Sequence, residues 1–225
     1  GNKFSAEEIM SFYKSVVREI SSLVPEGSVS VEVYADKQSS ADNLFEQGRD
    51  MFSWIPNAHI KYPITKAGLE AANRSVAEGI RVNMTLCFNQ EQAAAVYAAT
   101  CGAKKGDVFV SPFVGRLDDK GQNGMDLIKN ILKMYQAGDG HSEVLSASVR
   151  NLDHFLYSLK LECDIITAPF KVLKEWADKG MPTNLAPIPY QEIDLEKPWQ
   201  EYNFSHEMTD VGIERFAGDW NTLIK

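Results

Sequence analysis

The sequence is poor in the residues that hold disulfides and metal ions. It has three cysteines, Cys87, Cys101 and Cys163, an odd number without a Cys-x-x-Cys pair. We therefore expect them to be small apolar core residues in a reducing compartment, which predicts a cytoplasmic protein. The four histidines lack the spacing of metal ligands, so no metal site is expected.

Other absences narrow the class of protein further. No apolar run approaches the roughly 18 residues of a membrane helix, and the first residues lack the pattern of a signal peptide. Lysine and arginine are not clustered and the formal net charge is −8, so neither nucleic acid nor a membrane is an expected partner. Neither a Walker A loop nor a Gly-x-Gly-x-x-Gly fingerprint occurs, and no cofactor is expected.

The sequence does contain a regular alternation of strands and helices. A first helix is predicted to begin at Ser5, which with Glu8 has the spacing of a capping box. One face of this helix carries Ile9, Phe12, Val16, Ile20 and Leu23. Six short strands are predicted at 29–35, 58–64, 81–88, 107–114, 143–149 and 163–170. Helices are predicted at 40–54, 65–78, 90–101, 124–136, 151–160 and 171–179. This alternation is typical of βαβ units around a parallel sheet.

The end of the chain departs from this rhythm. Residues 181–205 hold four prolines and are predicted to form a loop that either wraps another part of the molecule or extends freely. A last helix is predicted to begin at Thr209-Asp210, and its apolar residues need a partner, either the barrel wall or another subunit. We treat residues 1–225 as one domain, with barrel units at 28–180, a proline-rich loop at 181–205 and a C-terminal helix at 206–225.

Lys61 lies in the middle of the second predicted strand. An ammonium group removed from water costs several kcal/mol unless it is paired. A buried lysine often loses its proton instead, and the neutral amine is a nucleophile. The alternative is an edge strand whose lysine points to solvent, and this strand alone does not separate the two.

Isolated polar residues recur in the neighbouring strands and favour a barrel over a doubly wound sheet. Side chains alternate between the two faces of a strand, so Asn83 and Thr85 share one face. The polar strand residues are Glu32, Lys61, Asn83, Thr85, Ser111, Ser146 and Ser148. In a (β/α)8 barrel they would converge near the C-terminal mouth, where active sites lie. The alternative is a set of core hydroxyl groups whose hydrogen bonds are satisfied structurally.

Several stretches together resemble a known family. They are Val-Ser-Val-Glu-Val at 29–33, Ile-Lys-Tyr-Pro-Ile-Thr at 60–65, Asn-Met-Thr-Leu-Cys-Phe at 83–88, Ser-Pro-Phe-Val-Gly-Arg-Leu-Asp-Asp at 111–119, Ala-Ser-Val-Arg-Asn at 147–151 and Thr-Asp-Val-Gly-Ile-Glu-Arg-Phe at 209–216. In this order the set resembles the small bacterial-type transaldolases, a branch that includes fructose-6-phosphate aldolase. The resemblance implies a TIM barrel and a class I aldolase, in the pentose phosphate pathway for a transaldolase.

The resemblance also implies roles for individual residues. Lys61 would form a Schiff base with a ketose phosphate. Glu32 and Thr85 would hold a catalytic water, and a carboxylate with a hydroxyl group is chemically suited to that task. Asn83 and Ser111 would hydrogen-bond the dihydroxyacetone part of the substrate.

Four further residues match the family's substrate-binding positions. Arg116, Ser148 and Arg150 would clamp the substrate phosphate, since guanidinium groups suit phosphate in geometry and charge. For each arginine alone, a surface ion pair is the alternative. Phe113 favours transaldolase, because the resemblance associates tyrosine at this position with fructose-6-phosphate aldolase. The resemblance further implies a homo-oligomer.

The sequence departs from the family at its N-terminal side. A barrel of this type needs eight strands, and only six are predicted here. The two earlier strands of the family carry an aspartate that acts as general acid and base, whereas no aspartate precedes Asp36. We expect that a preceding segment is missing from the sequence, and the alternative is a fragment that cannot complete the site. Three functions stay open: a transaldolase, an aldolase that releases free dihydroxyacetone, and a non-catalytic barrel that binds sugar phosphate or serves in assembly.

Overall fold

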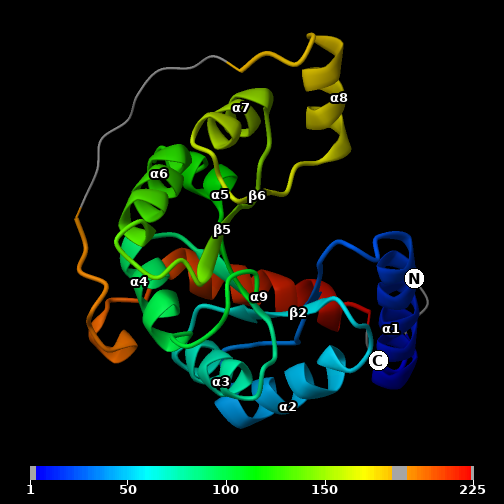
Figure 1. Ribbon diagram of the computed structural model, residues 1–225. Coiled ribbons are helices and arrows are strands. Elements are labelled where there is room, and N and C mark those ends of the chain that lie inside the picture. Colours follow the sequence, from blue (N-terminus) through cyan, green and yellow to red (C-terminus); the bar gives the residue numbers. More distant parts are fainter. Residues whose placement is uncertain (1–3, 184–191, 224–225) are drawn as a thin grey trace.

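The centre of the molecule is a parallel sheet of six strands. The computed structural model describes residues 4–183 and 192–223. The strands are paired in chain order: β1 (Val29–Glu32), β2 (Ala58–Pro63), β3 (Val82–Cys87), β4 (Val108–Pro112), β5 (Ser142–Ser146) and β6 (Ile165–Ile166). The sheet curls into a half-barrel with helices on its outside (Figure 1). This confirms the predicted TIM-barrel type of α/β fold with six βα units.

The predicted helices form within a few residues of their expected bounds. They are α1 (Ala6–Leu23), α2 (Ala41–Phe52), α3 (Lys66–Ala77), α4 (Gln90–Ala99), α6 (Gly124–Tyr135), α7 (Leu152–Lys160), α8 (Phe170–Asp178) and α9 (Glu207–Asn221). Ser5 and Glu8 form the expected capping box at the start of α1. The side chains of Ser40, Thr65 and Asn151 likewise accept hydrogen bonds from the first turns of α2, α3 and α7.

The core lies between the outer face of the sheet and the surrounding helices. In β2 the outward residues are Ile60 and Tyr62, both fully buried. The Tyr62 hydroxyl is hydrogen-bonded to Ser75 of α3 at 3.0 Å. Gly48 of α2 has no room for a Cβ atom against Tyr62, so the absence of a side chain there lets α2 approach the sheet closely. Because the outer face takes the apolar residues, the alternating polar residues point to the barrel interior.

Three details of the β4–β6 region differ from the sequence predictions. No helix is predicted between the strand at 107–114 and the helix at 124–136, yet a short helix, α5 (Val114–Asp118), forms there. β5 ends at Ser146, and β6 has only two residues. Ser146 points outward, where it accepts a hydrogen bond from Ser158 of α7, so its predicted inward position is wrong. Glu143 of β5 pairs with the inward Phe109 of β4, and this register places Ser146 on the opposite face.

The face of α1 that packs against the rest of the molecule is not the face that carries its predicted apolar residues. Ile9 and Val17 are buried, whereas Phe12 and Leu23 are 71% and 74% exposed. Tyr13 explains this orientation, because its hydroxyl accepts a 2.8 Å hydrogen bond from the Glu32 amide at the edge of β1. An edge strand presents unpaired backbone groups, and α1 satisfies one of them here.

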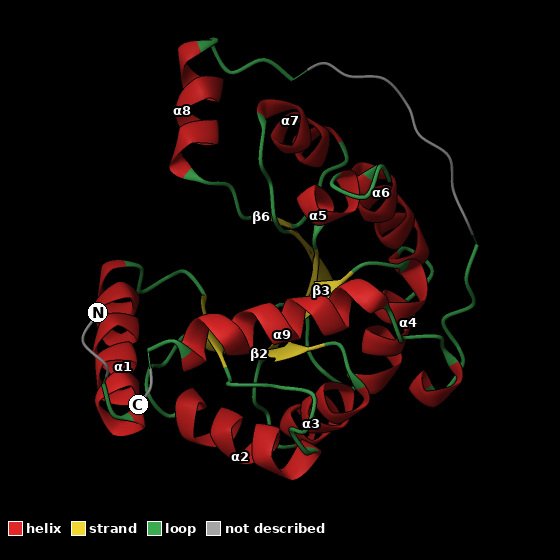
Figure 2. Ribbon diagram, turned by 180° about the vertical axis from the view of Figure 1, so that it is seen from behind, coloured by secondary structure: helices red, strands yellow, loops and turns green. Residues whose placement is uncertain are grey.

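The C-terminal part of the chain returns to the barrel. Residues 184–191 of the predicted proline-rich loop lie outside the described residues, and in the remainder a 3-10 turn, Trp199–Glu201, packs against α4 with Tyr202 buried next to it. Helix α9 crosses the sheet between α4 and α1 (Figure 2). The Thr209 hydroxyl donates a 2.9 Å hydrogen bond to the Leu86 carbonyl of β3. Of the two partners predicted for this helix, the barrel wall or another subunit, the structure shows contact with the barrel of the same chain.

The cysteines follow the core prediction only in part. Cys87 is buried, Cys163 is half-buried and Cys101 is exposed, so the expectation of a core position is wrong for Cys101. All three are free thiols. No helix in the described ranges is both long enough and apolar enough to cross a membrane.

Candidate active site

Lys61 stands at the centre of a row of polar side chains that crosses three strands. The strand register pairs Glu32 with Lys61, and Lys61 with Asn83. Neighbouring residues in a parallel sheet point to the same side, so all three face the barrel interior. The Lys61 Nζ atom lies 3.0 Å from Glu32 Oε2, and the lysine side chain is 21% exposed. The ammonium group is thus largely removed from solvent and paired with one carboxylate.

A chain of hydrogen bonds fixes the polar side chains around this row. The Ser111 hydroxyl of β4 donates to Asn83 Oδ1 at 2.6 Å, and Asn83 Nδ2 donates to the Ser30 hydroxyl of β1 at 2.9 Å. His59 lies two residues before Lys61 in β2, and Phe109 lies two residues before Ser111 in β4. Their rings stack with centroids 4.1 Å apart. Burial is the main cause that lowers the pKa of His59. The stacked pair forms an uncharged floor beneath Lys61.

Thr85 differs from its neighbours because its hydroxyl is unsatisfied. It is fully buried on the face that it shares with Asn83, and its Oγ1 atom has no hydrogen-bond partner among the described residues. A buried hydroxyl without a partner is unfavourable by roughly 1–3 kcal/mol. Such a group suits a site whose partner arrives with a ligand or a water molecule.

Arg116 lies at the end of β4, one turn into α5. Its guanidinium carbon is 5.3 Å from the ring centre of Phe113 and 5.5 Å from that of Phe216 in α9. Phe216 also lies 5.9 Å from Lys61 Nζ, so a single ring adjoins both cations. Burial first, then the positive charges of Arg215 and Arg150, lower the pKa of Arg116. Among the described residues no carboxylate forms an ion pair with Arg116, although the negative charge of Asp119 acts to raise its pKa.

Arg150 is held at the adjoining loop by a separate network. Its guanidinium pairs with Asp119, and the hydrogen bond from Arg150 is the main cause that lowers the pKa of Asp119. The Arg150 amide donates to His154 Nδ1 at 3.4 Å, and His154 Nε2 is bonded to Asp118. These contacts connect the loop after β5 to α5 and fix the backbone position of Arg150.

The loop that carries Ser148 approaches α5 closely. Ser148 has a left-handed backbone with φ of 59°, and its carbonyl accepts a 3.2 Å hydrogen bond from the Gly115 amide. A Cβ atom at Gly115 would meet this carbonyl oxygen at 2.5 Å and would collide with Arg150. Glycine therefore permits the approach of the two loops. The Ser148 side chain is half-exposed at the same end of the barrel.

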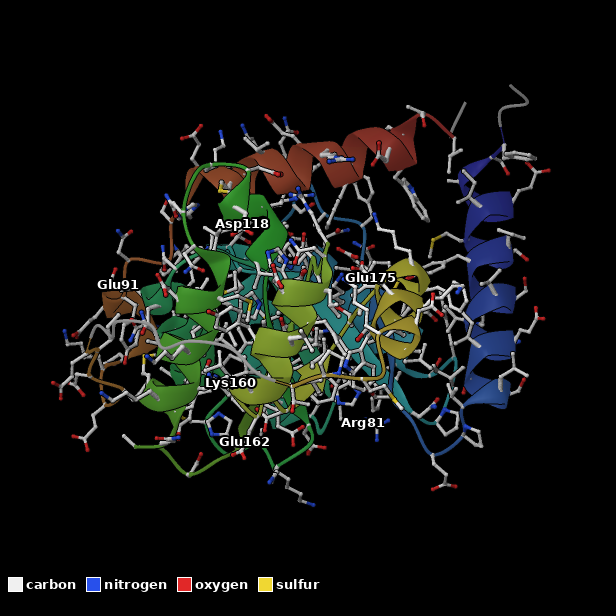
Figure 3. All side chains as sticks on the ribbon, turned by 90° about the horizontal axis from the view of Figure 1, so that it is seen from above. Arg81, Glu91, Asp118, Lys160, Glu162 and Glu175 are labelled. Carbon is white, nitrogen blue, oxygen red and sulfur yellow. The ribbon has the colours of Figure 1, made fainter. Side chains whose placement is uncertain are left out.

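Helix α9 lies over the C-terminal ends of the strands. In Figure 3 it passes beside α5, where Asp118 is labelled after β4, and Arg81 before β3 is labelled on the opposite side. Gly212 of α9 is so close that a Cβ atom there would lie 2.8 Å from Arg116 Nη1. The candidate residues therefore gather at the mouth of the barrel and not at its base.

Comparisons with known proteins identify the family. A family described as Transaldolase/Fructose-6-phosphate aldolase matches residues 5–225. The chain belongs to this transaldolase/fructose-6-phosphate aldolase family. It is 37% identical over 220 residues to a probable transaldolase of Dehalococcoides mccartyi, covering 98% of this chain and 85% of that relative. It is 39% identical over 215 residues to a probable transaldolase of a Roseiflexus species, covering 96% and 82%.

An archaeal relative gives the same result. The chain is 36% identical over 219 residues to a probable transaldolase of Methanococcus vannielii, covering 97% of this chain and 84% of the relative. Membership in the transaldolase/fructose-6-phosphate aldolase family indicates an enzyme of the transaldolase or aldolase type. It also agrees with the TIM-barrel type of fold described above.

The family comparison does not by itself assign residues, but the geometry shows which predicted ones meet. Eight of them are brought to one face or one end of the barrel: Glu32, Lys61, Asn83, Thr85, Ser111, Phe113, Arg116 and Arg150. Ser148 lies on the adjoining loop, where its backbone carbonyl contacts Gly115. Among the described residues, no group of three or more acidic, histidine or cysteine side chains could hold a metal ion.

Sequence reasoning missed some contributors to the site. Phe216 had been considered only as part of an apolar helix face, yet its ring adjoins both Lys61 and Arg116. Asp119 had been quoted only within a motif, yet it pairs with Arg150. The spacing of Gly212, Arg215 and Phe216 could have indicated a common contact face, because residues three and four apart are neighbours on a helix surface.

Proposed function

We propose that this chain is a transaldolase that moves a dihydroxyacetone unit from a ketose phosphate to an aldose phosphate. Donors of this class include fructose 6-phosphate and sedoheptulose 7-phosphate, which are sugars of the pentose phosphate pathway. The observation that carries the proposal is Lys61, which is largely buried in an inward row with Glu32 and Asn83. A cytoplasmic location and a single-domain organisation of residues 1–225 are parts of the same proposal.

The proposed chemistry begins with Lys61. Its neutral amine attacks the ketone carbon of the donor, and loss of water gives an iminium ion. The C3–C4 bond then breaks as its electrons move toward the iminium, and the C4 hydroxyl loses its proton as the shorter aldose phosphate departs. The resulting enamine on Lys61 attacks the aldehyde carbon of the acceptor. Hydrolysis of the new iminium restores the amine and releases the longer ketose phosphate.

Glu32 and Thr85 are proposed to manage the protons of these steps. Glu32 already accepts the Lys61 ammonium hydrogen bond at 3.0 Å, so it can take the proton that makes the amine nucleophilic. The unsatisfied Thr85 hydroxyl supports the proposal that a water molecule binds between these groups. Asn83 and Ser111 are proposed to hydrogen-bond the dihydroxyacetone hydroxyls, because their existing bonds hold them on the same face.

The phosphate of the substrate is proposed to bind Arg116, Arg150 and Ser148. Arg116 is partly buried beside the positive charges of Arg215 and Arg150, and no carboxylate in the described part of the chain forms an ion pair with it, a combination that suits an anion. A cavity of about 370 Å³ adjoins the site between α1 and α9, and both Glu32 and Phe216 line it. Its lining is mainly apolar, with Tyr13, Ile213 and Trp220, so we place the polar sugar over Lys61 instead.

Borohydride trapping tests the proposed function. Incubation with fructose 6-phosphate and borohydride should add a reduced three-carbon unit or the whole sugar to the Lys61 peptide, as measured by mass spectrometry. Lys61→Ala should lose both trapping and turnover while it keeps its circular dichroism spectrum. Lys104, an exposed lysine, provides the control, because Lys104→Ala should trap as the wild type does. Trapping in the Lys61→Ala protein would overturn the mechanism.

The alternatives give different results in the same experiment. A non-catalytic barrel would bind phosphate without trapping. An aldolase would trap but would release dihydroxyacetone with sustained turnover when no acceptor is present. We also propose a homo-oligomer, which the exposed Phe12 and Leu23 of α1 support because such apolar groups favour burial. A monomer mass in light scattering at micromolar concentration would contradict that assembly.

A further inference from the structure

The inference concerns Arg215, a residue of α9 outside the phosphate clamp described above. We propose that Arg215 is a third guanidinium of the phosphate site, so that α9 contributes directly to the preference for phosphorylated substrates. This inference rests on the proposed function, because it concerns the phosphate site of the same barrel mouth.

Helix α9 is fixed in position over the mouth by contacts on both its sides. Thr209 is buried and bonded both to the Leu86 carbonyl of β3, at 2.9 Å, and to Gln92 of α4, at 2.8 Å. On the other side, Glu214 forms a 2.6 Å ion pair with Lys37 in the loop after β1. The helix is therefore held across the strand ends, with little freedom to rotate about its own axis.

The fixed helix presents one side to Arg116. A Cβ atom at Gly212 would lie 2.8 Å from Arg116 Nη1, and the ring of Phe216 is 5.5 Å from the Arg116 guanidinium carbon. Arg215 lies three residues after Gly212 and directly before Phe216. Residues three and four apart in a helix are neighbours on its surface, so Arg215 begins beside the point of contact.

The charge balance of this region is unusual for an acidic protein. Three guanidinium groups, those of Arg116, Arg150 and Arg215, act on one another at one end of a chain with formal net charge −8. Carboxylates lie beside two of them, because Asp119 pairs with Arg150 and Asp219 lies 4.0 Å from Arg215. The positive charge of Arg215 acts on Arg116 alongside that of Arg150 and helps to lower its pKa, after the larger effect of burial. Like charges brought together are unfavourable, and an anion bound among them removes the repulsion.

The side chain of Arg215 is held less closely by a carboxylate than that of Arg150. Arg150 is paired with Asp119. The Arg215 side chain is 70% exposed, and the carboxylate of Asp219 on the same helix is 4.0 Å away, at the limit of an ion pair. A phosphate dianion on Arg116 can therefore draw the flexible Arg215 side chain over it, with two or more charge-assisted hydrogen bonds. Arg215 would be a substrate-binding residue and would not take part in bond making.

Two measurements on the whole chain test this role. The first is the dissociation constant of inorganic phosphate, measured by calorimetry. The second is the concentration dependence of borohydride trapping with fructose 6-phosphate and with unphosphorylated dihydroxyacetone. Arg215→Gln keeps the length of the side chain and removes its charge. We expect about five- to tenfold weaker binding of phosphate and of fructose 6-phosphate, because exposed charges interact less strongly than buried ones. Trapping by dihydroxyacetone should be unchanged.

Ionic strength and two further variants sharpen the test. The gap between wild type and Arg215→Gln should narrow when sodium chloride rises from about 20 to 300 mM, because salt screens exposed charges. Arg215→Lys should recover part of the lost affinity. The matched control is Arg49→Gln in α2, since Arg49 is also an exposed helical arginine with an acidic neighbour, Glu46, on its own helix. It should bind phosphate as the wild type does.

The possible results separate this inference from the proposed function. Wild-type affinity in Arg215→Gln, or an equal loss in Arg49→Gln, would overturn the role of Arg215 and leave the Lys61 chemistry intact. Weaker phosphate binding in Arg215→Gln, in a protein whose Lys61 traps no sugar, would support the phosphate site and refute the transaldolase proposal. No phosphate binding by the wild type would overturn the three-guanidinium site.

Discussion

At the scale of single residues, the site depends on which groups lack a partner. Lys61 has Glu32, and Arg150 has Asp119, whereas the Thr85 hydroxyl has no hydrogen-bond partner among the described residues. Paired charges are stabilised before substrate arrives, and an unsatisfied buried group becomes more stable when a ligand satisfies it. A side chain that adds or removes one hydrogen-bond donor near Lys61 should therefore change the outcome of the reaction more than the stability of the fold.

Phe113 gives the sharpest prediction at this scale. Its ring is largely buried beside Arg116, and it can donate no proton. Phe113→Tyr should raise the release of glyceraldehyde 3-phosphate from fructose 6-phosphate with no acceptor present. A tyrosine hydroxyl could protonate the enamine and so allow free dihydroxyacetone to leave. A hundredfold change in partition requires only about 2.7 kcal/mol between two barriers.

Phe113→Leu is the matched control, because it removes the ring and adds no hydroxyl group. It should not raise the release of glyceraldehyde 3-phosphate. Sustained release by the wild-type protein in the same assay would make the transaldolase proposal wrong and favour the aldolase.

At the scale of elements, the mouth depends on two close approaches made possible by glycine. Gly115 lets α5 meet the loop after β5, and Gly212 lets α9 meet Arg116. The atoms that an added Cβ would meet differ between these two glycines. At Gly115 a Cβ atom would meet a backbone carbonyl, which cannot move alone, whereas at Gly212 it would meet the flexible ends of Leu86 and Arg116. The first contact should therefore be the more sensitive to substitution.

Gly115→Ala is predicted to separate α5 from the Ser148 loop. The added Cβ atom would lie 2.5 Å from the Ser148 carbonyl oxygen and would displace Arg150. Overpacking of this kind typically costs about 1–3 kcal/mol of unfolding free energy. Urea denaturation should show this loss, and trapping should weaken for fructose 6-phosphate more than for dihydroxyacetone.

The control is Gly218→Ala in α9, where the added Cβ atom would meet nothing within 4 Å. Alanine is favoured over glycine inside a helix by up to about 1 kcal/mol, so this variant should be as stable as the wild type or more so. If Gly115→Ala also retained full stability and wild-type trapping by both sugars, the proposed contact between the two loops would have no functional importance.

At the scale of the whole molecule, the opposite end of the barrel holds a separate stabilising network. Tyr97 of α4 donates a 2.7 Å hydrogen bond to Asp139, and the buried His141 before β5 also bonds to Asp139. His141 Nε2 lies 3.1 Å from the Thr100 hydroxyl at the end of α4. The network joins two consecutive βα units at their base, far in sequence from Lys61, so it should affect stability without affecting the chemistry.

The pKa of Asp139 predicts how stability depends on pH. Burial acts to raise this pKa, but hydrogen bonds from Tyr97 and His141 outweigh it and lower the value to about 2. The pKa of an aspartate in an unfolded chain is about 3.9. Ionisation of Asp139 therefore stabilises the folded state relative to the unfolded state. The contribution of Asp139 should be fully present above that unfolded value and should disappear as the pH falls through it toward 2.

Thermal unfolding of Asp139→Asn checks this prediction. The difference in Tm between wild type and Asp139→Asn should be largest at neutral pH and should shrink by pH ~3, near the unfolded value. Glu19→Gln at an exposed position of α1 is the control and should show no such trend. A difference in Tm that stayed constant with pH would show that the carboxylate charge is not the cause.

The sequence by itself determined the order of the βα units and the identity of most candidate site residues. The alternation of apolar and polar residues sets which face of each strand points inward, and this period is a local property. Lys61, Asn83 and Ser111 therefore face the interior as predicted. The capping residues likewise fixed where helices such as α1 and α3 begin.

Only the tertiary structure decided how distant segments complete the mouth. The prediction that Ser146 points inward was wrong. The register of β5, which is set by its pairing with β4, places this side chain on the outer face. The buried side of α1 was settled by the bond from Glu32 to Tyr13, which its apolar pattern does not encode. The placement of Gly212 and Phe216 beside Arg116 depends on contacts across about a hundred residues of chain, and no local pattern carries that information.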